Sequence, residues 1–432
     1  MKYLSIVLLL LLSTPCSAGI YIDIKESGTK KFPIALNRLF IKTDDPMMRK
    51  AEADFMETLR KDLDLMSVFQ ILPEKSFIEP ADKRMTLEAA KIDFDSWKMI
   101  DALALTKGVV SGTPEKLVME LYLYDTLAKK EIIAKRYTGA VDQVERIAHA
   151  FGNTIIESLL GEKGVFDTRI AFVCRHEKSK ELCVMDFNGD NRATLTHHRT
   201  IVLSPTWNPT NNSIYYTAFD RKDKPQLFSY DLGNNKAVKI SDFPGMAIGL
   251  SFEPLQKLLA TSLTKDGNAE VYLLNNYGDV VKRITTNKNI DVSPSFSPDG
   301  KEIVFVSDRD GKSQIYKMNR DGSSVRRLTF KGRNNTSPAW SPKGDKILFA
   351  GMDTDGQFDI FSMNTDGSGI TRLTYDTKNN EDPTWSPDGN MIAFVSTRKG
   401  KSQIYIMRPD GNRQTQLTFD SFDNTMPSWE AR

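Results

Sequence analysis

The sequence predicts a two-domain protein, in which a small N-terminal α/β domain is followed by a C-terminal six-bladed all-β propeller. Its 432 residues are more than one ordinary hydrophobic core holds. Strand-like and helix-like segments alternate up to about residue 163, whereas helical periodicity is lost from about residue 166 onward. In that second region an aromatic residue recurs every 44 or 45 residues, a period typical of propeller blades.

The N-terminal 18 residues have the pattern of a cleaved secretory signal peptide. Lys2 precedes the apolar stretch Leu4–Leu12, and small residues then lead to Ala18, so we expect cleavage between Ala18 and Gly19. The stretch is too short to span a bilayer, although an uncleaved anchor is the alternative. Cys16 is not directly preceded by the small residue that lipidation requires. We therefore expect an exported protein that does not span the membrane.

Residues 19–163 are predicted to form the α/β domain. Apolar residues at helical spacing indicate a helix over Pro46–Met66, and the last helix of the domain is expected to stop at Gly161. The other expected elements are an extended segment at Phe32–Ile41, strands at Val68–Leu72, Gly108–Gly112, Lys116–Tyr124 and Glu131–Tyr137, and helices at Ser96–Leu105 and Val141–Leu160.

Residues 164–432 are predicted to form the propeller. A set of strand-like segments beginning at Ile170 has no aromatic anchor before it, and the last anchor, Trp429, has no such set after it. In a closed ring the C-terminal segment therefore completes the blade that Ile170 begins, which leaves few exposed sheet edges. We expect the anchors to pack between blades rather than to form a ligand cage. The anchors are Trp207, Phe252, Phe296, Trp340, Trp385 and Trp429.

Two cysteines of the propeller region, Cys174 and Cys183, lie in consecutive strand-like segments. The intervening turn lies midway between them, so they are expected to sit opposite each other in a hairpin, at a separation that a disulfide bridges. An oxidising compartment would permit this bond. The alternative is a pair of half-buried thiols, and the sequence leaves both interpretations open.

The sequence offers little chemistry for catalysis. The net charge of +2 gives no bias toward nucleic acid or membrane lipid as partners. The pairs Gly311-Lys312 and Gly400-Lys401 lack the earlier glycine of a phosphate-binding loop, and no Gly-x-Ser-x-Gly motif occurs. Adjacent histidines on a strand point to opposite faces, so His197-His198 makes a poor metal site. We expect no enzyme activity, no cofactor, no metal and no nucleic-acid partner.

Polar segments precede the anchors and are the candidate binding surface. Each must cross from the outer edge of one blade to the innermost strand of the next, so all should lie near one mouth of the channel. Their convergence on a rigid scaffold favours binding, and solvated loops with useful turn chemistry are the alternative. The candidate residues are Asn289, Asp291, Asn334, Asn335, Thr336, Asn380, Glu381, Asp382, Asn424 and Thr425.

The repeated sequence motif resembles the propeller of the TolB family. The repeats share the consensus Ser-Pro-x-Trp-Ser-Pro-Asp-Gly, followed by an apolar strand, an Ile-Tyr strand and Asp-Gly. The domain junction at Phe166–Val173, and Trp97 followed by Gly108–Gly112, are also similar to that family. The repeat alone is weakly specific because other propellers contain it, but the resemblance covers essentially the whole mature chain.

The resemblance implies a non-enzymatic periplasmic component of the Tol–Pal envelope system, monomeric outside its complexes. Such proteins bind the lipoprotein Pal at a propeller mouth and the C-terminal domain of TolA through a mobile N-terminal segment; other outer-membrane proteins are further candidates. They support outer-membrane integrity and invagination during cell division. Here the segment would be residues 19–25, where Ile20, Tyr21, Ile22, Asp23 and Ile24 alternate as an addable strand does. The alternative is a fixed strand of the N-terminal domain, or a segment that switches between the two states.

One repeat departs from the pattern. The sequence around Phe252 lacks the preceding proline and the Asp-Gly turn. It adjoins the loop Phe243–Met246, which the resemblance to the family would place against the partner. The apolar Met246 suits a protein contact. The competing function classes are an exported hydrolase or peptidase with a gating propeller, and a propeller that binds a small ligand or glycan. A hydrolase would need a catalytic domain, and about 145 residues without a nucleophile motif remain outside the ring.

Overall fold

The computed structural model describes residues 31–80, 83, 85–219, 224–241, 246–254, 258–352, 356–375 and 377–431. The chain divides into two compact units, one containing most residues up to Glu162 and the other containing Leu65–Ser67 and the chain from Lys163 onward. The signal peptide, its expected cleavage site at Ala18–Gly19 and the N-terminal segment at residues 19–25 lie outside the described residues.

The N-terminal unit is built on one mixed sheet with the order β3-β1-β4-β5-β6, and β2 also pairs with β4. The pairs β1/β3, β1/β4 and β2/β4 are parallel, whereas β4/β5 and β5/β6 are antiparallel. The strands are β1 Phe32–Leu36, β2 Phe40–Ile41, β3 Phe69–Ile71, β4 Ala104–Thr113, β5 Lys116–Asp125 and β6 Lys130–Gly139.

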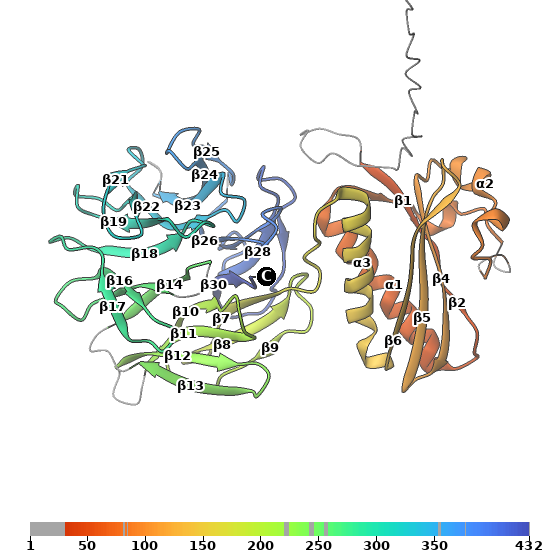
Figure 1. Cartoon of the computed structure of the whole chain (residues 1–432), viewed down its shortest axis with the longest axis horizontal. Helices are drawn as coiled ribbons and strands as arrows, with labels where there is room; N and C mark the ends of the chain where they lie inside the picture. The colour runs from red at the N-terminus through yellow and green to blue at the C-terminus, as the bar shows by residue number, and fades with distance from the viewer. Residues whose placement is uncertain are drawn as a thin grey trace, which may run out of the picture. The chain divides into compact units, whose positions relative to one another are not determined.

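Two long helices, α1 (Pro46–Met66) and α3 (Val144–Leu160), belong to the same unit (Figure 1). They contact each other through the rings of Phe55 and Phe151, whose centroids are 6.3 Å apart, and through His149 Nδ1 and Asp62 Oδ2 at 2.6 Å. The helix α3 ends at Gly161, which has the expected left-handed conformation with φ of 71°. Short elements complete the unit: α2 Phe94–Lys98, η1 Glu74–Ser76, η3 Ala89–Lys91 and η4 Val141–Gln143.

The helix expected over Ser96–Leu105 is wrong in its second half. The helix α2 ends at Lys98, Asp101 adopts a left-handed φ of 60°, and β4 begins at Ala104. Ala104 and Leu105 pair with β1 and so belong to the sheet, although their sequence is compatible with either helix or strand. Pairing with β1 overrides the local helical preference here.

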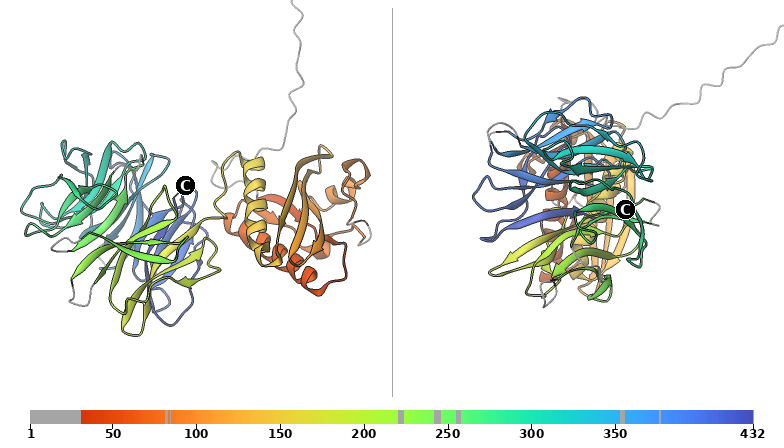
Figure 2. Two further views of the ribbon diagram at one scale, coloured as in Figure 1. Left: turned by 60° about the horizontal axis from the view of Figure 1, so that its bottom comes forward. Right: turned by 90° about the vertical axis from the view of Figure 1, so that its left-hand side faces the viewer.

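The second unit is a propeller of six four-stranded antiparallel sheets that follow one another around a ring (Figures 1 and 2). Each anchor ends the innermost strand of its sheet. From the innermost strand outward, the sheets are β10 Val202–Trp207, β11 Ser213–Phe219, β12 Pro225–Asp231, β13 Lys236–Ser241; β14 Ala247–Phe252, β15 Leu259–Leu263, β16 Glu270–Leu274, β17 Val280–Arg283; β18 Asp291–Phe296, β19 Glu302–Ser307, β20 Gln314–Asn319, β21 Arg326–Arg327; β22 Asn334–Trp340, β23 Lys346–Met352, β24 Phe358–Asn364, β25 Thr371–Arg372; β26 Asn380–Trp385, β27 Ile392–Ser396, β28 Gln403–Met407, β29 Thr415–Gln416; and β30 Asn424–Trp429, β7 Arg169–His176, β8 Ser179–Asp186, β9 Ala193–Thr194.

The ring closes as the sequence predicts. The C-terminal strand β30 pairs with β7, with Trp429 opposite Ile170. Arg169 and Glu430 add an ion pair at this junction, with Arg169 Nη2 2.8 Å from Glu430 Oε1. One blade is therefore assembled from both ends of the propeller sequence, and six blades with meeting ends are confirmed.

The anchors pack between neighbouring blades, which confirms their structural role. Trp207 packs in one cluster with Ala171 and Val173 of the closing sheet. Its indole Nε1–H donates to the carbonyl oxygen of Ser428 at 3.0 Å, and Trp385 makes the equivalent bond to Ala339 at 3.2 Å. A large ring therefore fills the space between two blades while its polar edge binds the preceding innermost strand.

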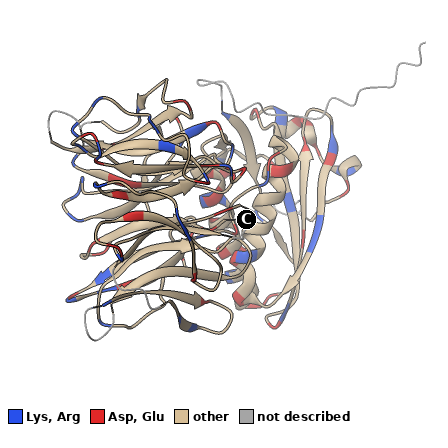
Figure 3. Ribbon diagram, turned by 60° about the vertical axis from the view of Figure 1, so that its left-hand side comes forward, with Lys and Arg blue, Asp and Glu red and all other residues tan. Residues whose placement is uncertain are grey.

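Two general features of the described residues are their hydropathy and their charge. No helix within the described ranges is long and apolar enough to cross a bilayer. Basic and acidic residues are interspersed in both units (Figure 3), consistent with the net charge of +2. Neither feature identifies a binding surface, so the site must be sought in local geometry.

Candidate functional site

The propeller encloses a channel cavity of about 630 Å³, lined by residues from all six innermost strands. Each of these strands is interrupted by a bulge, and one residue at the bulge adopts a positive φ. A bulge changes the direction of a strand and redirects a side chain. These six residues, the bulge ring, all line the cavity: Ser204, Gly249, Ser293, Ser337, Asp382 and Met426.

Asp382 brings the only ionisable side chain into the bulge ring. Ser337 Oγ donates to Asp382 Oδ1 at 3.0 Å. Burial raises the pKa of Asp382 above its ordinary value, although the Ser337 hydroxyl and the backbone N–H of Met426 oppose the shift. Burial also raises the pKa of the neighbouring Glu381, and the charge of Asp382 adds to that shift. Two adjacent carboxyl groups thus resist ionisation, and that of Asp382 lines the channel.

Four of the expected mouth residues are buried, contrary to the expectation that they face a partner. Asp291, Asn335, Asn380 and Asn424 are each at most 3% exposed. They lie at the first position of an innermost strand, or at the second in the case of Asn335. The alternation of side chains along a strand turns them away from the channel. Their side chains therefore cannot contact a partner directly.

The three asparagines among these four residues hold neighbouring blades together through their side chains. Asn380 Nδ2 donates to Asp359 Oδ1 at 2.9 Å and to Thr377 Oγ1 at 2.6 Å. Equivalent bonds from Asn335 to Gln314 and from Asn424 to Gln403 measure 2.9 and 3.1 Å. The fourth residue differs: the buried carboxylate of Asp291 pairs with Arg309 of its own blade, whose Nη2 is 3.0 Å from Asp291 Oδ2, and its backbone N–H donates to the Ala269 carbonyl oxygen of the preceding blade at 2.8 Å. The polar character that suggested a binding loop serves the connection between blades.

The other expected residues are half-buried and remain candidates: Met246, Asn289, Asn334, Thr336, Glu381, Asp382 and Thr425. Thr336, Glu381 and Thr425 occupy the same position in three consecutive innermost strands, one residue before the bulge. The equivalent residues of the remaining blades are apolar. We call this set the mouth ring: Leu203, Ile248, Val292, Thr336, Glu381 and Thr425.

Three exposed aromatic side chains beside this mouth were not predicted from the sequence. Phe330, Tyr375 and Phe419 are 72, 57 and 74% exposed. Each follows the outermost strand of a blade and precedes the innermost strand of the next, so the chain topology places all three at the end of the channel where the innermost strands begin. The guanidinium of Arg327 lies 5.0 Å from the Phe330 ring centroid, and that of Arg372 lies 5.3 Å from the Tyr375 centroid.

We call Phe330, Tyr375 and Phe419 the aromatic arc. The sequence does contain its signal, because Leu-Thr-aromatic recurs at Leu328–Phe330, Leu373–Tyr375 and Leu417–Phe419. Leucine is buried and threonine is buried in each triplet, whereas the aromatic residue is exposed. A large apolar side chain exposed at one position in three consecutive blades is unusual for a purely structural repeat.

Cys174 and Cys183 form a disulfide, with sulfur atoms 1.95 Å apart and Cα atoms 5.8 Å apart. The expectation that they face each other directly is wrong. Cys174 is opposite Glu181 and Cys183 is opposite Phe172, so the two cysteines are diagonal neighbours in the hairpin. The hairpin turn is centred on residues 177 and 178, one position earlier than the symmetric placement assumed from the sequence.

Comparisons with known protein families match both units. A family model described as "TolB beta propeller domain" matches residues 156–355 and 337–432, and one described as "TolB amino-terminal domain" matches residues 20–132. Together these matches cover most of the chain.

Curated relatives carry the same name. The chain is 35% identical over 265 residues to "Tol-Pal system protein TolB" of Desulfosudis oleivorans, covering 61% of this chain and 60% of the relative. It is 34% identical over 260 residues to the protein of the same name from Pelagibacter ubique, covering 57% and 56%. The matched part thus spans less than two thirds of the length of these relatives.

A solved structure has the same fold over nearly the whole chain. The crystal structure of TolB from Acinetobacter baumannii superposes with a TM-score of 0.81, covering 96% of this chain and all of the other, at 24% sequence identity. The putative TolB from Agrobacterium tumefaciens gives a TM-score of 0.51 over 60% of this chain and 91% of its own, at 23% identity. At these identities the similarity supports the fold alone.

Proposed function

Because this chain belongs to the TolB family, we propose that it is a non-enzymatic, periplasmic protein-binding component of the Tol–Pal system. In this proposal the propeller binds the lipoprotein Pal at the mouth that carries the aromatic arc. The N-terminal segment, residues 19–25, binds the C-terminal domain of TolA. The two contacts together support outer-membrane integrity and invagination during cell division, and other outer-membrane proteins are further candidate partners.

The aromatic arc is the observation that carries the proposal. Exposed apolar side chains that gather on one face of a monomeric protein mark protein interfaces, and aromatic and arginine side chains contribute most to binding at such interfaces. Arg327 and Arg372 lie beside two of the three exposed rings. The six residues of the mouth ring are half-buried; they are apolar in three blades and polar in the other three. The same mouth therefore offers both the hydrophobic centre and the polar positions of a protein-binding surface.

The test is a binding titration against the soluble domain of Pal from the same organism. The variant Phe330→Ser/Tyr375→Ser/Phe419→Ser removes the arc without touching a buried side chain. We expect its affinity for Pal to fall by about tenfold or more, because loss of several interface aromatics costs well over 1.4 kcal/mol.

Tyr277→Ser is the matched control. Tyr277 is 82% exposed, and it lies in the turn between the two outer strands β16 and β17, on the opposite face of the propeller. The control should bind Pal as the wild type does. Unchanged affinity of the arc variant, or an equal loss with Tyr277→Ser, would contradict the proposed site.

The contact with TolA is tested separately. Deleting residues 19–25 should abolish binding of the TolA C-terminal domain because an added strand supplies its affinity through main-chain hydrogen bonds. Pal should bind the deletion variant more tightly than it binds the arc variant. That result would show that the two binding surfaces are separable. If TolA binds the deleted protein as tightly as the full chain, the N-terminal segment is not its site.

A further inference from the structure

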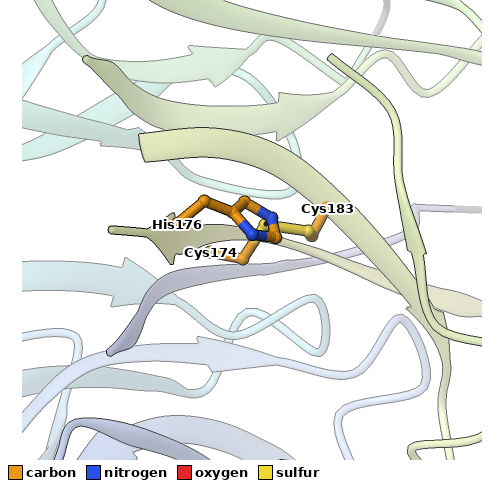
Figure 4. A group of neighbouring side chains, drawn as sticks. All are labelled: Cys174, His176 and Cys183. Atoms are coloured by element: carbon orange, nitrogen blue, oxygen red, sulfur yellow. Dashed lines mark hydrogen bonds between the residues drawn. A yellow bond between two sulfur atoms is a disulfide. The ribbon is translucent and has the colours of Figure 1, made fainter. Parts of the chain in front are cut away.

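A histidine lies against the disulfide of the closing blade (Figure 4). His176 is two residues beyond Cys174 on β7, so both side chains project from the same face of the strand. His176 Nε2 is 3.5 Å from Cys174 Sγ, and the potential ligand atoms of Cys174, His176 and Cys183 all lie within 4.8 Å of one another. Two sulfurs and an imidazole nitrogen are the ligand types that zinc prefers.

One distance in the group already has the value that a tetrahedral zinc ion requires. Zinc–sulfur bonds of about 2.3 Å and zinc–nitrogen bonds of about 2.0 Å place the sulfur and nitrogen of one tetrahedral site about 3.5 Å apart. The separation of Cys174 Sγ and His176 Nε2 already has this value. Two thiolates on one zinc ion lie about 3.8 Å apart, so the sulfurs need only separate by a rotation of the side chains once they are no longer bonded to each other.

The site has an open side through which an ion could enter. Both cysteines are buried, but His176 is exposed and borders a cavity of about 290 Å³. Thr194 lies opposite Cys183 in the register of β8 and β9, with its Oγ1 3.4 Å from Cys183 Sγ and 3.3 Å from His176 Nε2. The Thr194 hydroxyl therefore borders the Cys174–His176–Cys183 group on the side of β9.

Glu181 is the nearest carboxylate of the same cavity, and it serves another purpose. Its oxygens accept hydrogen bonds from Thr196 Oγ1 at 2.7 Å and from the backbone N–H groups of His198 and Arg199 at 3.0 and 2.7 Å. These bonds fix the loop after β9. The three-residue group of Cys174, Cys183 and His176 would therefore leave the fourth position of a zinc ion to water, which is the arrangement of an open zinc site.

We propose that the reduced form of this chain binds one zinc ion through Cys174 Sγ, Cys183 Sγ and His176 Nε2. The disulfide and the metal are mutually exclusive, because a sulfur in a disulfide has no thiolate to donate. A dithiol reductant first transfers two electrons and two protons to the disulfide, yielding two thiols and the oxidised dithiol. Zinc then displaces two protons from the thiols, so its affinity should rise with pH.

The test titrates Co²⁺ into the purified chain after reduction with dithiothreitol and anaerobic removal of the reductant. Cobalt occupies zinc sites and reports tetrahedral thiolate ligation through its visible absorption. We expect one Co²⁺ per reduced chain, displaced by one equivalent of Zn²⁺, and no such spectrum from the oxidised chain. Cys174→Ser/Cys183→Ser should give no such spectrum under reducing conditions either.

The variant His176→Asn tests whether zinc is bound by the histidine as well as by the two thiols. Loss of one of three ligands should weaken zinc binding by about tenfold or more, as even changes beside metal ligands do. His197→Asn, which replaces the other histidine bordering the cavity, should leave the affinity unchanged. The proposal fails if the reduced chain binds no metal, whether it stays folded or unfolds, or if His197→Asn weakens binding while His176→Asn does not.

Discussion

The buried amide of Asn380 is the residue on which the connection between two blades most visibly depends. It donates to Asp359, to Thr377 and to the carbonyl oxygen of Lys378. Asn380→Ala would leave the buried Asp359 carboxylate without one of its donors. We expect the free energy of unfolding to fall by about 2–3 kcal/mol, the cost of leaving a buried charged acceptor short of a partner, measured by urea denaturation.

The matched control is Lys378→Ala, two residues earlier on the same loop. Lys378 is exposed, and surface substitutions of this kind change stability by about 0.5 kcal/mol or less. If Asn380→Ala is as mild as Lys378→Ala, the interpretation of the buried amides as connections between blades is wrong.

Asp382 gives the channel a predictable dependence on pH. Burial raises its pKa in the folded state, so the folded state holds this proton to higher pH than the unfolded state, in which an aspartate titrates near 3.9. The stability that this proton provides is therefore present at low pH and lost as pH rises through the folded-state pKa. Asp382→Asn, which retains an oxygen to accept from Ser337, should remove that loss.

We expect Asp382→Asn to be more stable than the wild type at pH 7 by about 1 kcal/mol, the scale of one buried polar group. The difference should shrink on acidification toward pH 4. Thermal denaturation of both proteins across this range measures it. A variant that is less stable than the wild type at pH 7, or a stability difference that grows on acidification, would contradict the raised pKa of the Asp382 carboxyl group in the bulge ring.

Residue roles were the part that the sequence predicted least well. Asn335, Asn380 and Asn424 were expected at the partner-binding mouth, yet their side chains are buried between blades near the start of the innermost strands. Polarity alone cannot distinguish a buried connection from a binding side chain, because both need hydrogen-bonding groups. Phe330, in turn, reads as the end of a strand, and only the structure reveals its exposure.

Among the elements, the hairpin turns between the outer strands have the strictest steric requirement. Gly411 has a φ of 82°, and a Cβ added there would lie 2.4 Å from the carbonyl oxygen of Leu373 in the preceding blade. Gly411→Ala must therefore move one blade relative to the next. Gly400 also has a positive φ, of 102°, but nothing lies within 4 Å of an added Cβ.

Comparing Gly411→Ala with Gly400→Ala separates backbone strain from the clash between blades. Strain at a positive φ costs about 1–3 kcal/mol in either variant, so Gly400→Ala should lose about that much in chemical denaturation. Gly411→Ala should lose at least 1 kcal/mol more, since overpacking typically costs about 1–3 kcal/mol. Equal losses would mean that this turn is not held against the neighbouring blade.

Elements with a clear period were predicted well, and elements within a mixed pattern were not. The helix α1 spans the expected Pro46–Met66, because an amphipathic stripe sustained over 21 residues is unambiguous. Residues 99–105 carry no such signal, and pairing of Ala104 and Leu105 with β1 decides their conformation. That pairing joins segments about 70 residues apart, which local periodicity cannot report.

At the scale of the whole molecule, ring closure depends on the last strand. Trp429 is 5% exposed, and its indole N–H donates to Thr168 Oγ1 at 2.8 Å. Trp429→Ala and Trp385→Ala remove the same side chain from equivalent slots, so each should cost about 3–5 kcal/mol. Only Trp429 lies on a strand that reaches its blade from the far end of the chain.

Hydrogen exchange should therefore distinguish the two variants. In Trp429→Ala, the amides of β7 and β30 should exchange faster by local opening of the closing blade. In Trp385→Ala, exchange of β26 should follow global unfolding, because the chain continues on both sides of that strand. Equal behaviour of the two variants would show that closure is not a separate weak point.

Ring closure itself was predictable from the sequence, because the phase of six anchors against six strand sets leaves one arrangement. The exposure of the three rings of the aromatic arc was not, since the triplet Leu-Thr-aromatic does not show which of its side chains the blades bury. Once the four-stranded topology is known, residues 328–333 and 417–423 must lie at the mouth where the innermost strands begin. The proposed partner surface follows from that topology and not from any one motif.

The most direct test of the central claim is a hydrogen-exchange footprint of the wild-type chain with and without the soluble domain of Pal. We predict slower exchange in residues 328–333 and 417–423 on binding, with no change in the turns at the opposite mouth, such as residues 275–279. Absence of binding by a folded chain, or protection confined to residues 275–279 and their equivalents, would contradict the account.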